Sequence, residues 1–207
     1  MSSQLKELID LHADVVPLTV EQYHQMIRTG ILEEGLPIEL LDGYLVRKDR
    51  AKAGEDSMTI GHEHAWVVRK LTHLSQSLLK FGCDIQVQLP ITLPPDGEPE
   101  PDATIVRGTT EDYRDRHPEP GDILYVIEVA DSSLQRDRTT KQRMYADAGI
   151  PRYLIVNLVD KTIEEYAEPR AGAGRYDVSQ VLRKGQDLRL ELDGERHIDL
   201  PVADLLP

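Results

Sequence analysis

Residues 122–157 constrain the fold of this chain more than any other stretch, because they predict two strands and a helix in an order that permits few arrangements. The first apolar run, residues 123–129, is nearly continuous and rich in β-branched side chains, as in a strand that is buried on both faces. A helix is predicted over residues 135–148, where a glycine and a proline follow, and a second apolar run covers residues 153–156. This order predicts a crossover unit in which two parallel strands lie side by side.

Glu128 interrupts the first apolar run with a carboxylate. An unpaired charge among core side chains is costly, so this carboxylate needs a cation or a hydrogen-bonding partner. On the predicted helix, Asp137, Lys141 and Tyr145 lie at steps of four residues and share one face. The crossover therefore places a buried acid near a helix that carries a lysine. A second interpretation of Lys141 is a weak surface partner of Asp137.

The composition limits the classes of partner. The chain has 207 residues, with 24 Lys and Arg against 37 Asp and Glu and a formal net charge of −13. This length predicts a single domain over residues 1–207 with a substantial core. The acidic balance argues against tight non-specific binding to long nucleic acid, because phosphate contacts dominate such affinity. Basic side chains are still concentrated at residues 47–52 and 136–143, where a local basic patch would lie.

Cys83 is the one cysteine, which excludes an internal disulfide and a cysteine-based zinc site within one chain. We predict that its thiol is buried, as free cysteines usually are. No apolar run approaches the roughly 20 residues that span a bilayer, and the N-terminal stretch lacks the pattern of a secretory signal. A soluble cytoplasmic protein without membrane contact is therefore predicted.

The rest of the chain is predicted to supply further helices, short strands and loops. Helices are expected over residues 3–12, 19–30 and 61–82. A tight turn at Asp42-Gly43 is expected to join two short strands. Loops are expected over residues 51–57 and 108–121, and strands over residues 83–93 and 102–106. The last strands are expected as a meander or hairpins that cover one edge of the sheet, over residues 162–167, 174–181, 188–192 and 197–200.

Three acids are candidates for a shared site. Asp102 opens a predicted strand, Glu128 lies near the end of another, and Glu39 lies in the first arm of the hairpin. Carboxylates gathered in one place repel one another unless a cation neutralises them, and hard oxygen ligands with open positions suit Mg²⁺ or Mn²⁺. Such a metal polarises a phosphoryl oxygen and supplies an activated water. Taken singly, Asp102 and Glu39 also have a simpler interpretation as solvated or ion-paired side chains.

Two other groups of residues are weaker candidates for a metal site or for catalysis. His62 and His64 point to different sides of the predicted helix, which favours caps or surface contacts over a zinc site. Ser132 and Ser133 lack an obvious histidine and aspartate arrangement, which argues against a serine hydrolase.

The order of these residues resembles a known family. The chain has Pro101-Asp102, then Glu128-Val129-Ala130, then Asp137 and Lys141 on a helix that leads into the segment YADAGIPRY. This set resembles the Uma-type (Uma-two) restriction-endonuclease-like proteins of the PD-(D/E)XK nuclease superfamily. The resemblance covers most of the chain, and residues 127–153 are its most specific part. It implies an α/β, restriction-endonuclease-like fold, with a central mixed β-sheet flanked by helices, and the patterns above add antiparallel strands toward the C-terminal end.

The resemblance also implies a metal site. Asp102 and Glu128 would hold Mg²⁺ or Mn²⁺, with Glu39 as a third candidate ligand. The superfamily places a lysine two residues after the second acid, where this chain has Ala130. Lys141 is the candidate replacement, because a long side chain can reach the same space from the following helix. Its role would be to orient or activate water, or to stabilise charge that develops on the phosphate.

Three further residues are candidates for substrate contact. The resemblance places His64 near the site, where it would touch substrate or position a water. Asp137 shares the helix face of the candidate lysine. Tyr145 is expected to pack in the core or to form a hydrogen bond at the edge of the site.

Together these inferences predict a metal-dependent, endonuclease-like phosphodiesterase that hydrolyses DNA through Asp102, Glu128, Lys141 and Glu39. The resemblance implies a homodimer, in which two sites meet two strands. One alternative is a weak or inactive protein of the same fold that binds nucleic acid or a protein partner, favoured by Ala130 and by the net charge of −13. A second alternative is a metal-dependent hydrolase of a small phosphorylated molecule.

Overall fold

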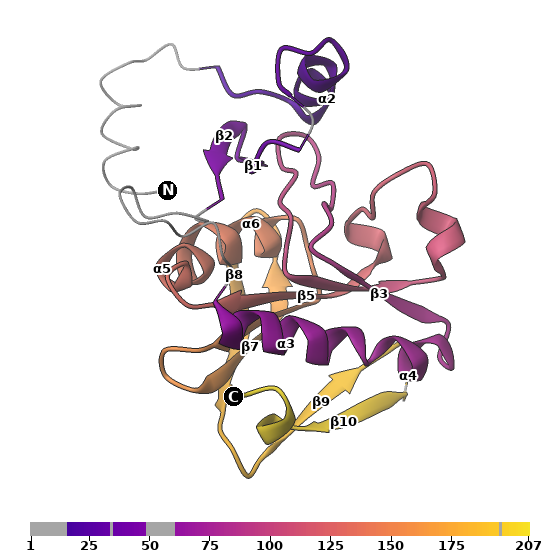
Figure 1. Cartoon of the computed structure of the whole chain (residues 1–207), viewed down its shortest axis with the longest axis vertical. Helices are drawn as coiled ribbons and strands as arrows, with labels where there is room; N and C mark the ends of the chain where they lie inside the picture. The colour runs from indigo at the N-terminus through magenta and orange to yellow at the C-terminus, as the bar shows by residue number, and fades with distance from the viewer. Residues whose placement is uncertain (1–15, 34, 49–60, 195) are drawn as a thin grey trace.

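The computed structural model describes residues 16–33, 35–48, 61–194 and 196–207, and its centre is a mixed six-stranded sheet. The strand order is β3-β4-β5-β6-β7-β8. In chain order these strands are β3 (Cys83–Val87), β4 (Ala103–Arg107), β5 (Ile123–Ala130), β6 (Arg152–Asn157), β7 (Thr162–Arg170) and β8 (Arg175–Leu182). Strands β5 and β6 pair in parallel, and the other neighbours pair antiparallel (Figure 1). The predicted central mixed sheet is confirmed.

The crossover between β5 and β6 is also confirmed. All eight residues of β5 are buried, as its apolar run predicts. The connecting helix consists of α5 (Leu134–Arg136), the π-helical turn η3 (Asp137–Lys141) and α6 (Gln142–Asp147). Its position is as predicted, but its middle is wider than a regular α-helix. Side-chain hydroxyls bond to carbonyl oxygens in and just before this turn, which helps to stabilise the wider geometry.

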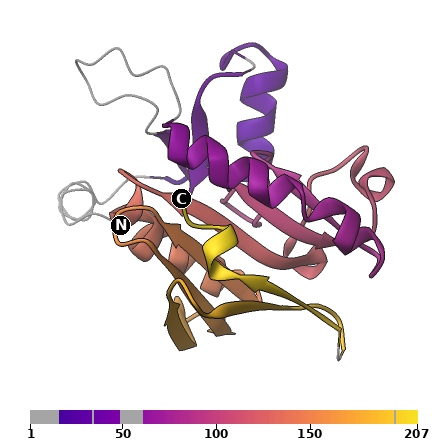
Figure 2. The ribbon, with the colours of Figure 1, turned by 60° about the horizontal axis from the view of Figure 1, so that its bottom comes forward.

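Helices cover both faces of the sheet. Met144, Tyr145 and Ile150, from α6 and the loop after it, pack against Val126 and Ala130 of β5 on one face. The opposite face packs against α3 (His62–Thr72) and α4 (Ser75–Leu79). Figure 2 shows α3 running along the sheet. Strand β5 therefore lies between two layers, which explains why every side chain in it is enclosed.

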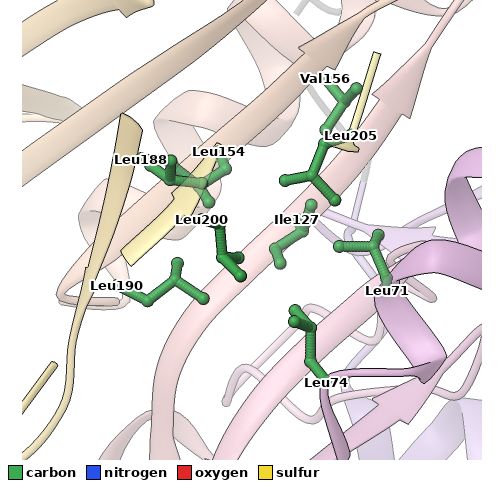
Figure 3. Close-up of a pocket in the computed structure, with 9 residues that line it drawn as sticks. All are labelled: Leu71, Leu74, Ile127, Leu154, Val156, Leu188, Leu190, Leu200 and Leu205. Atoms are coloured by element: carbon green, nitrogen blue, oxygen red, sulfur yellow. The ribbon is translucent and has the colours of Figure 1, made fainter. Parts of the chain in front are cut away.

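The sequence predicted that the C-terminal strands cover one edge of the sheet, but only some of them do so. Only β7 and β8 extend the edge, whereas β9 (Asp187–Glu191) and β10 (His197–Pro201) form a separate antiparallel pair, followed by η4 (Val202–Asp204). Leu188 and Leu190 of β9 point into the core on the α3 face. Figure 3 shows apolar side chains from α3, the central strands and the C-terminal strands pointing toward one another. The apolar face of the pair requires burial, so it folds across the sheet.

The long helix predicted over residues 61–82 is divided into α3 and α4. The Thr72 hydroxyl donates to the carbonyl of Arg69 at 2.6 Å, and the N–H of His73 bonds to a carbonyl only three residues back. This tightened turn ends α3, because the serine and threonine hydroxyls compete with backbone donors for carbonyl oxygens. Leu79, at the end of α4, is 50% exposed, whereas the neighbouring Leu78 is buried.

The strand predicted over residues 83–93 ends at Val87. Gln88 has a φ angle of 52°, in the left-handed region, so the extended backbone stops there. The chain then takes an irregular path to β4, in which Leu93 forms a bridge with Gly97. Cys83, at the start of β3, is buried as predicted.

The N-terminal elements within the described residues agree with the sequence. Helix α2 (Val20–Arg28) begins with a capping box of Thr19 and Gln22, and Asp42-Gly43 joins β1 (Ile38–Leu41) to β2 (Tyr44–Arg47). The charged loop over residues 108–121 contains the short helices η1 (Thr110–Tyr113) and η2 (Pro120–Asp122). The predicted helix over residues 3–12 and the predicted loop over residues 51–57 lie outside the described residues. In the described part of the chain, no helix is long and apolar enough to cross a membrane.

Candidate active site

Strands β4 and β5 bring the two main acids together. Ala103 pairs with Ile127 in the antiparallel register, so Asp102, one residue earlier, comes to lie beside Glu128. The N–H of Val129 donates to Oδ2 of Asp102 at 2.8 Å, which holds this carboxylate against the end of β5. Because both strands are buried on their core faces, packing specifies the register and thereby the spacing of the acids.

The crossover helix directs two more side chains at Glu128. Lys141 Nζ and the Tyr145 hydroxyl each donate to Oε1 of Glu128 at 2.8 Å. Lys141 is only 6% exposed, and Tyr145 is fully buried. The interpretation of Lys141 as a surface partner of Asp137 is therefore wrong. Among the described residues both hydrogen bonds end on Oε1, which leaves Oε2 of Glu128 as the oxygen for a further ligand.

Glu39 reaches the same lysine from the β1–β2 hairpin. Its Oε1 lies 3.3 Å from Lys141 Nζ and accepts the N–H of Glu100 at 2.9 Å. Glu39 is buried, like Glu128 on the other side of the ammonium. A single lysine therefore bridges two acids that come from distant parts of the chain.

His64, in the first turn of α3, contacts Asp102. Its Nε2 lies 3.0 Å from Oδ1 of Asp102, and its Nδ1 is buried without a hydrogen-bond partner among the described residues. Burial opposes ionisation of His64, but the Asp102 carboxylate outweighs it and raises the pKa of the imidazole. Burial also works to raise the pKa of Asp102, but the hydrogen bonds from His64 and the Val129 N–H hold that pKa below its usual value. The contact thus favours an ionised Asp102.

Excess negative charge dominates the buried cluster. Burial raises the pKa of Glu128 to about 8, and the neighbouring carboxylates add to this effect against the charge of Lys141. Burial would lower the pKa of Lys141, but Glu128, Glu39 and Asp137 outweigh it and raise that pKa. Lys141 is therefore an ammonium at neutral pH. Burial thus favours the protonated form of Glu128, whereas the ammonium of Lys141, and a metal cation if one binds, favour its ionised form.

Asp137 and Tyr153 lie behind this cluster. Oδ2 of Asp137 accepts the Ser133 hydroxyl at 2.6 Å, and burial raises the pKa of this carboxyl. The Tyr153 hydroxyl donates to the main-chain carbonyl of Asp137 at 3.1 Å. Sequence reasoning missed Tyr153 as a site residue and did not connect Ser133 with Asp137. The signal for Tyr153 was a hydroxyl within an apolar strand, which does not by itself identify a partner on the preceding helix.

The sequence as a whole matches one family. The model of the Uma2 family, described as "Putative restriction endonuclease", matches residues 20–203. The chain belongs to the Uma2 family. The predicted resemblance is confirmed, and it identifies the protein as restriction-endonuclease-like. A search of curated proteins found no match.

A solved structure has the same fold as this Uma2 protein. It is described as a "putative nuclease belonging to DUF820" from Anabaena variabilis ATCC 29413. The similarity covers 91% of this chain and 97% of that chain, with a TM-score of 0.61 and 16% sequence identity. At this identity the similarity establishes the fold, and roles for individual residues must come from their geometry.

The donor set of the Uma2 protein is compatible with a hard divalent cation. Within residues 16–33, 35–48, 61–194 and 196–207, no group of three or more His, Cys, Asp or Glu side chains is arranged to hold a metal ion. Mg²⁺, however, commonly uses one or two carboxylates, with waters and substrate phosphate as its other ligands. Asp102 and Glu128 are two such carboxylates, and each retains lone pairs that its hydrogen bonds do not use. Glu39 instead faces Lys141 and a backbone N–H.

The basic side chains on the crossover helix are mostly paired with acids. Arg138 donates to Glu164 at 2.6 Å, and Arg143 forms ion pairs with Asp42 and Asp147. In the other predicted basic cluster, residues 49–52 lie outside the described residues. The described part of the crossover helix therefore presents less positive charge to a nucleic acid than its sequence suggests.

Replacing Glu128 with glutamine is expected to alter the pH dependence of stability in EDTA. Burial raises the pKa of this carboxyl from 4.5 to about 8, so proton binding by Glu128 stabilises the folded state. This stabilisation is fully present below pH 4.5 and is lost as pH rises through 8. The free energy of unfolding of Glu128→Gln relative to wild type should therefore rise between about pH 5 and pH 8. Denaturant titrations measure it, with the exposed Glu111→Gln as the control. A difference that stays constant with pH would contradict the shift.

Proposed function

We propose that this Uma2 protein is a Mg²⁺- or Mn²⁺-dependent endonuclease that hydrolyses phosphodiester bonds in DNA. The observation that carries the proposal is the buried ammonium of Lys141, held 2.8 Å from Glu128 at the point where Asp102 meets β5. A buried lysine beside several acids is costly to maintain for stability alone. The family match supports a nuclease-like activity.

Each residue of the cluster has a distinct proposed role. Asp102 and Glu128 would hold the metal, which when bound polarises a phosphoryl oxygen and makes a bound water more acidic. Lys141 would donate hydrogen bonds to the phosphate as negative charge develops on it. A role as general base is disfavoured, because the surrounding carboxylates raise its pKa and keep it protonated. Glu39 would orient this ammonium, which it contacts at 3.3 Å.

His64 and Tyr145 would hold the two metal-binding carboxylates in place. His64 contacts Oδ1 of Asp102, and Tyr145 donates to Oε1 of Glu128. Each contact limits the rotation of a carboxylate, which lowers the cost of arranging the site when substrate binds. Because Tyr145 is fully buried, its proposed role is this hydrogen bond, not direct contact with substrate.

Metal dependence provides the first test. Purified protein is expected to nick supercoiled DNA in Mg²⁺ or Mn²⁺ and to leave it intact in EDTA, with the rate restored when metal is returned. Parallel incubations with single-stranded DNA and RNA of matched length define the substrate class. Sedimentation equilibrium tests the proposed homodimer. Nicking that persists in EDTA would contradict a metal-dependent mechanism.

A second candidate is a protein of this fold that binds nucleic acid without cutting it. Two observations favour it, namely Ala130 at the usual position of the lysine and the acids that neutralise Arg138 and Arg143. This candidate predicts a shift of DNA in a gel at low salt without any cleavage. Absence of both cleavage and binding would instead favour a small phosphorylated substrate.

A further inference from the structure

The π-helical turn η3 lies directly before the lysine of the proposed site. In a regular α-helix, a carbonyl accepts the N–H four residues further on. Here the carbonyl of Asp137 accepts the N–H of Gln142, which is five residues further on. π-helical turns are rare and frequently occur at functional sites. This turn ends at Lys141, so its geometry determines where the ammonium points.

Two side-chain hydroxyls bond to carbonyl oxygens in and before this turn. Thr139 donates to the carbonyl of Gln135 at 2.7 Å, from within the helix. Tyr153 donates to the carbonyl of Asp137 at 3.1 Å, from strand β6. The second contact comes from another element and acts on the same oxygen that accepts the π-type bond. It therefore ties the helix turn to the central sheet.

The direction of Lys141 depends on that turn. One additional residue in a turn rotates the residues after it by about 100° relative to those before it, since an α-helix has 3.6 residues per turn. With the π turn in place, Lys141 Nζ lies 2.8 Å from Glu128 and 3.3 Å from Glu39. Asp137, at the start of the turn, directs its carboxylate to Ser133. A regular α-helix over the same residues would direct the lysine away from its present position between the two acids.

We propose that Tyr153 is a positioning residue, whose hydroxyl holds the π turn that directs Lys141 at Glu128. The inference rests on the proposed function, because the ammonium placed in this way is the one that would act on the phosphate. The Tyr153 ring is fully buried and packs 5.0 Å from Tyr145 and 5.8 Å from Tyr166, measured between ring centroids. These contacts hold the hydroxyl in place and involve the ring alone. Tyr153→Phe should therefore fold and lose only the hydrogen bond.

Tyr176 offers a matched control in the same group of aromatic rings. Its ring lies 6.4 Å from that of Tyr153, and its hydroxyl donates to the carbonyl of Ile150 at 3.0 Å. Tyr176→Phe removes an equivalent bond from a hydroxyl to a carbonyl, outside the π turn. Both variants are expected to lose similar stability, so only Tyr153→Phe should affect Lys141.

The test combines kinetics with two measurements that need no activity. For Tyr153→Phe, we expect kcat for DNA nicking to fall by about 10- to 100-fold with KM within about twofold of wild type, because a small misplacement of a catalytic group is costly. Amide exchange over residues 137–142 should accelerate, and a crystal structure should show Lys141 withdrawn from Glu128. Tyr176→Phe should match wild type in all three measurements.

The result that overturns the inference is a Tyr153→Phe structure that keeps both the π turn and the contact between Lys141 and Glu128. An equal loss of kcat in Tyr153→Phe and Tyr176→Phe would also overturn it, because a general packing effect would then suffice. If wild type cuts no DNA, the proposed function fails, whereas amide exchange and the crystal structure still decide the role of Tyr153.

Discussion

Replacing Lys141 with methionine is expected to lower the free energy of unfolding by about 3–5 kcal/mol, the usual cost of removing one partner from a buried ion pair. Methionine preserves much of the apolar stem and its packing, so the loss would come mainly from the charge. Lys141 contacts Glu128 and Glu39, and all three side chains are buried. Without the ammonium, the carboxyl groups of Glu128 and Glu39 would remain buried without their cationic partner. We also expect DNA nicking to fall by at least about a hundredfold.

Denaturant titration in EDTA measures this loss of stability. Arg143→Met is the matched control, because Arg143 lies on the same helix and pairs with Asp42 and Asp147 but is 36% exposed. Its removal is expected to cost no more than about 1 kcal/mol. Adding Glu128→Gln to Lys141→Met should recover part of the lost stability, because glutamine replaces one of the two ionisable groups left without the ammonium. Equal stability losses in Lys141→Met and Arg143→Met would contradict a buried charge cluster.

Asp102→Asn is expected to reduce DNA nicking by about a thousandfold or more while leaving the fold intact, because a preorganised charge in such a site contributes several kcal/mol to catalysis. Asparagine has nearly the same shape as aspartate, and its carbonyl oxygen can still accept the N–H of Val129. It lacks the negative charge that would hold the metal and face His64. Nicking rates at saturating Mn²⁺ and calorimetric titration with Mn²⁺ measure the two losses.

Asp193→Asn is the control for this prediction. Asp193 also forms a charged pair, with Arg107 at 2.9 Å, but it is 43% exposed and lies outside the candidate site. Its replacement is expected to leave nicking and Mn²⁺ binding unchanged. If Asp102→Asn cuts DNA as fast as Asp193→Asn does, the proposed metal site is wrong.

Local patterns in the sequence predicted most of the fold. The apolar run of β5, the helix after it and the second run of β6 each depend on residues that are close together in the chain. Two predicted element boundaries failed where a single residue changed the backbone path. The Thr72 hydroxyl ended α3 early, and the left-handed Gln88 ended β3. Neither residue carries a strong stop signal, because both types also occur within helices and strands.

The candidate site was predictable only in part. Glu128 was identifiable because a carboxylate within a buried strand needs a partner whatever the fold around it. The partner was not identifiable from local pattern, since a spacing of four residues places Lys141 and Asp137 on one face without saying whether that face is buried. The resemblance to the family placed His64 near the site, but its contact with Asp102 was not predicted. Tyr153 was missed because its partner is a main-chain carbonyl.

The sequence by itself therefore determined the crossover and the presence of a buried acid, because hydrophobic periodicity and the cost of burying charge act over a few residues. Only the tertiary structure decided which groups meet that acid. Asp102 reaches it through the register of β4 on β5, and Glu39 joins it from a separate hairpin through Lys141. The direction of Lys141 follows from a π turn bonded to β6. Register, hairpin docking and turn geometry depend on contacts between residues far apart in the chain, which no local pattern contains.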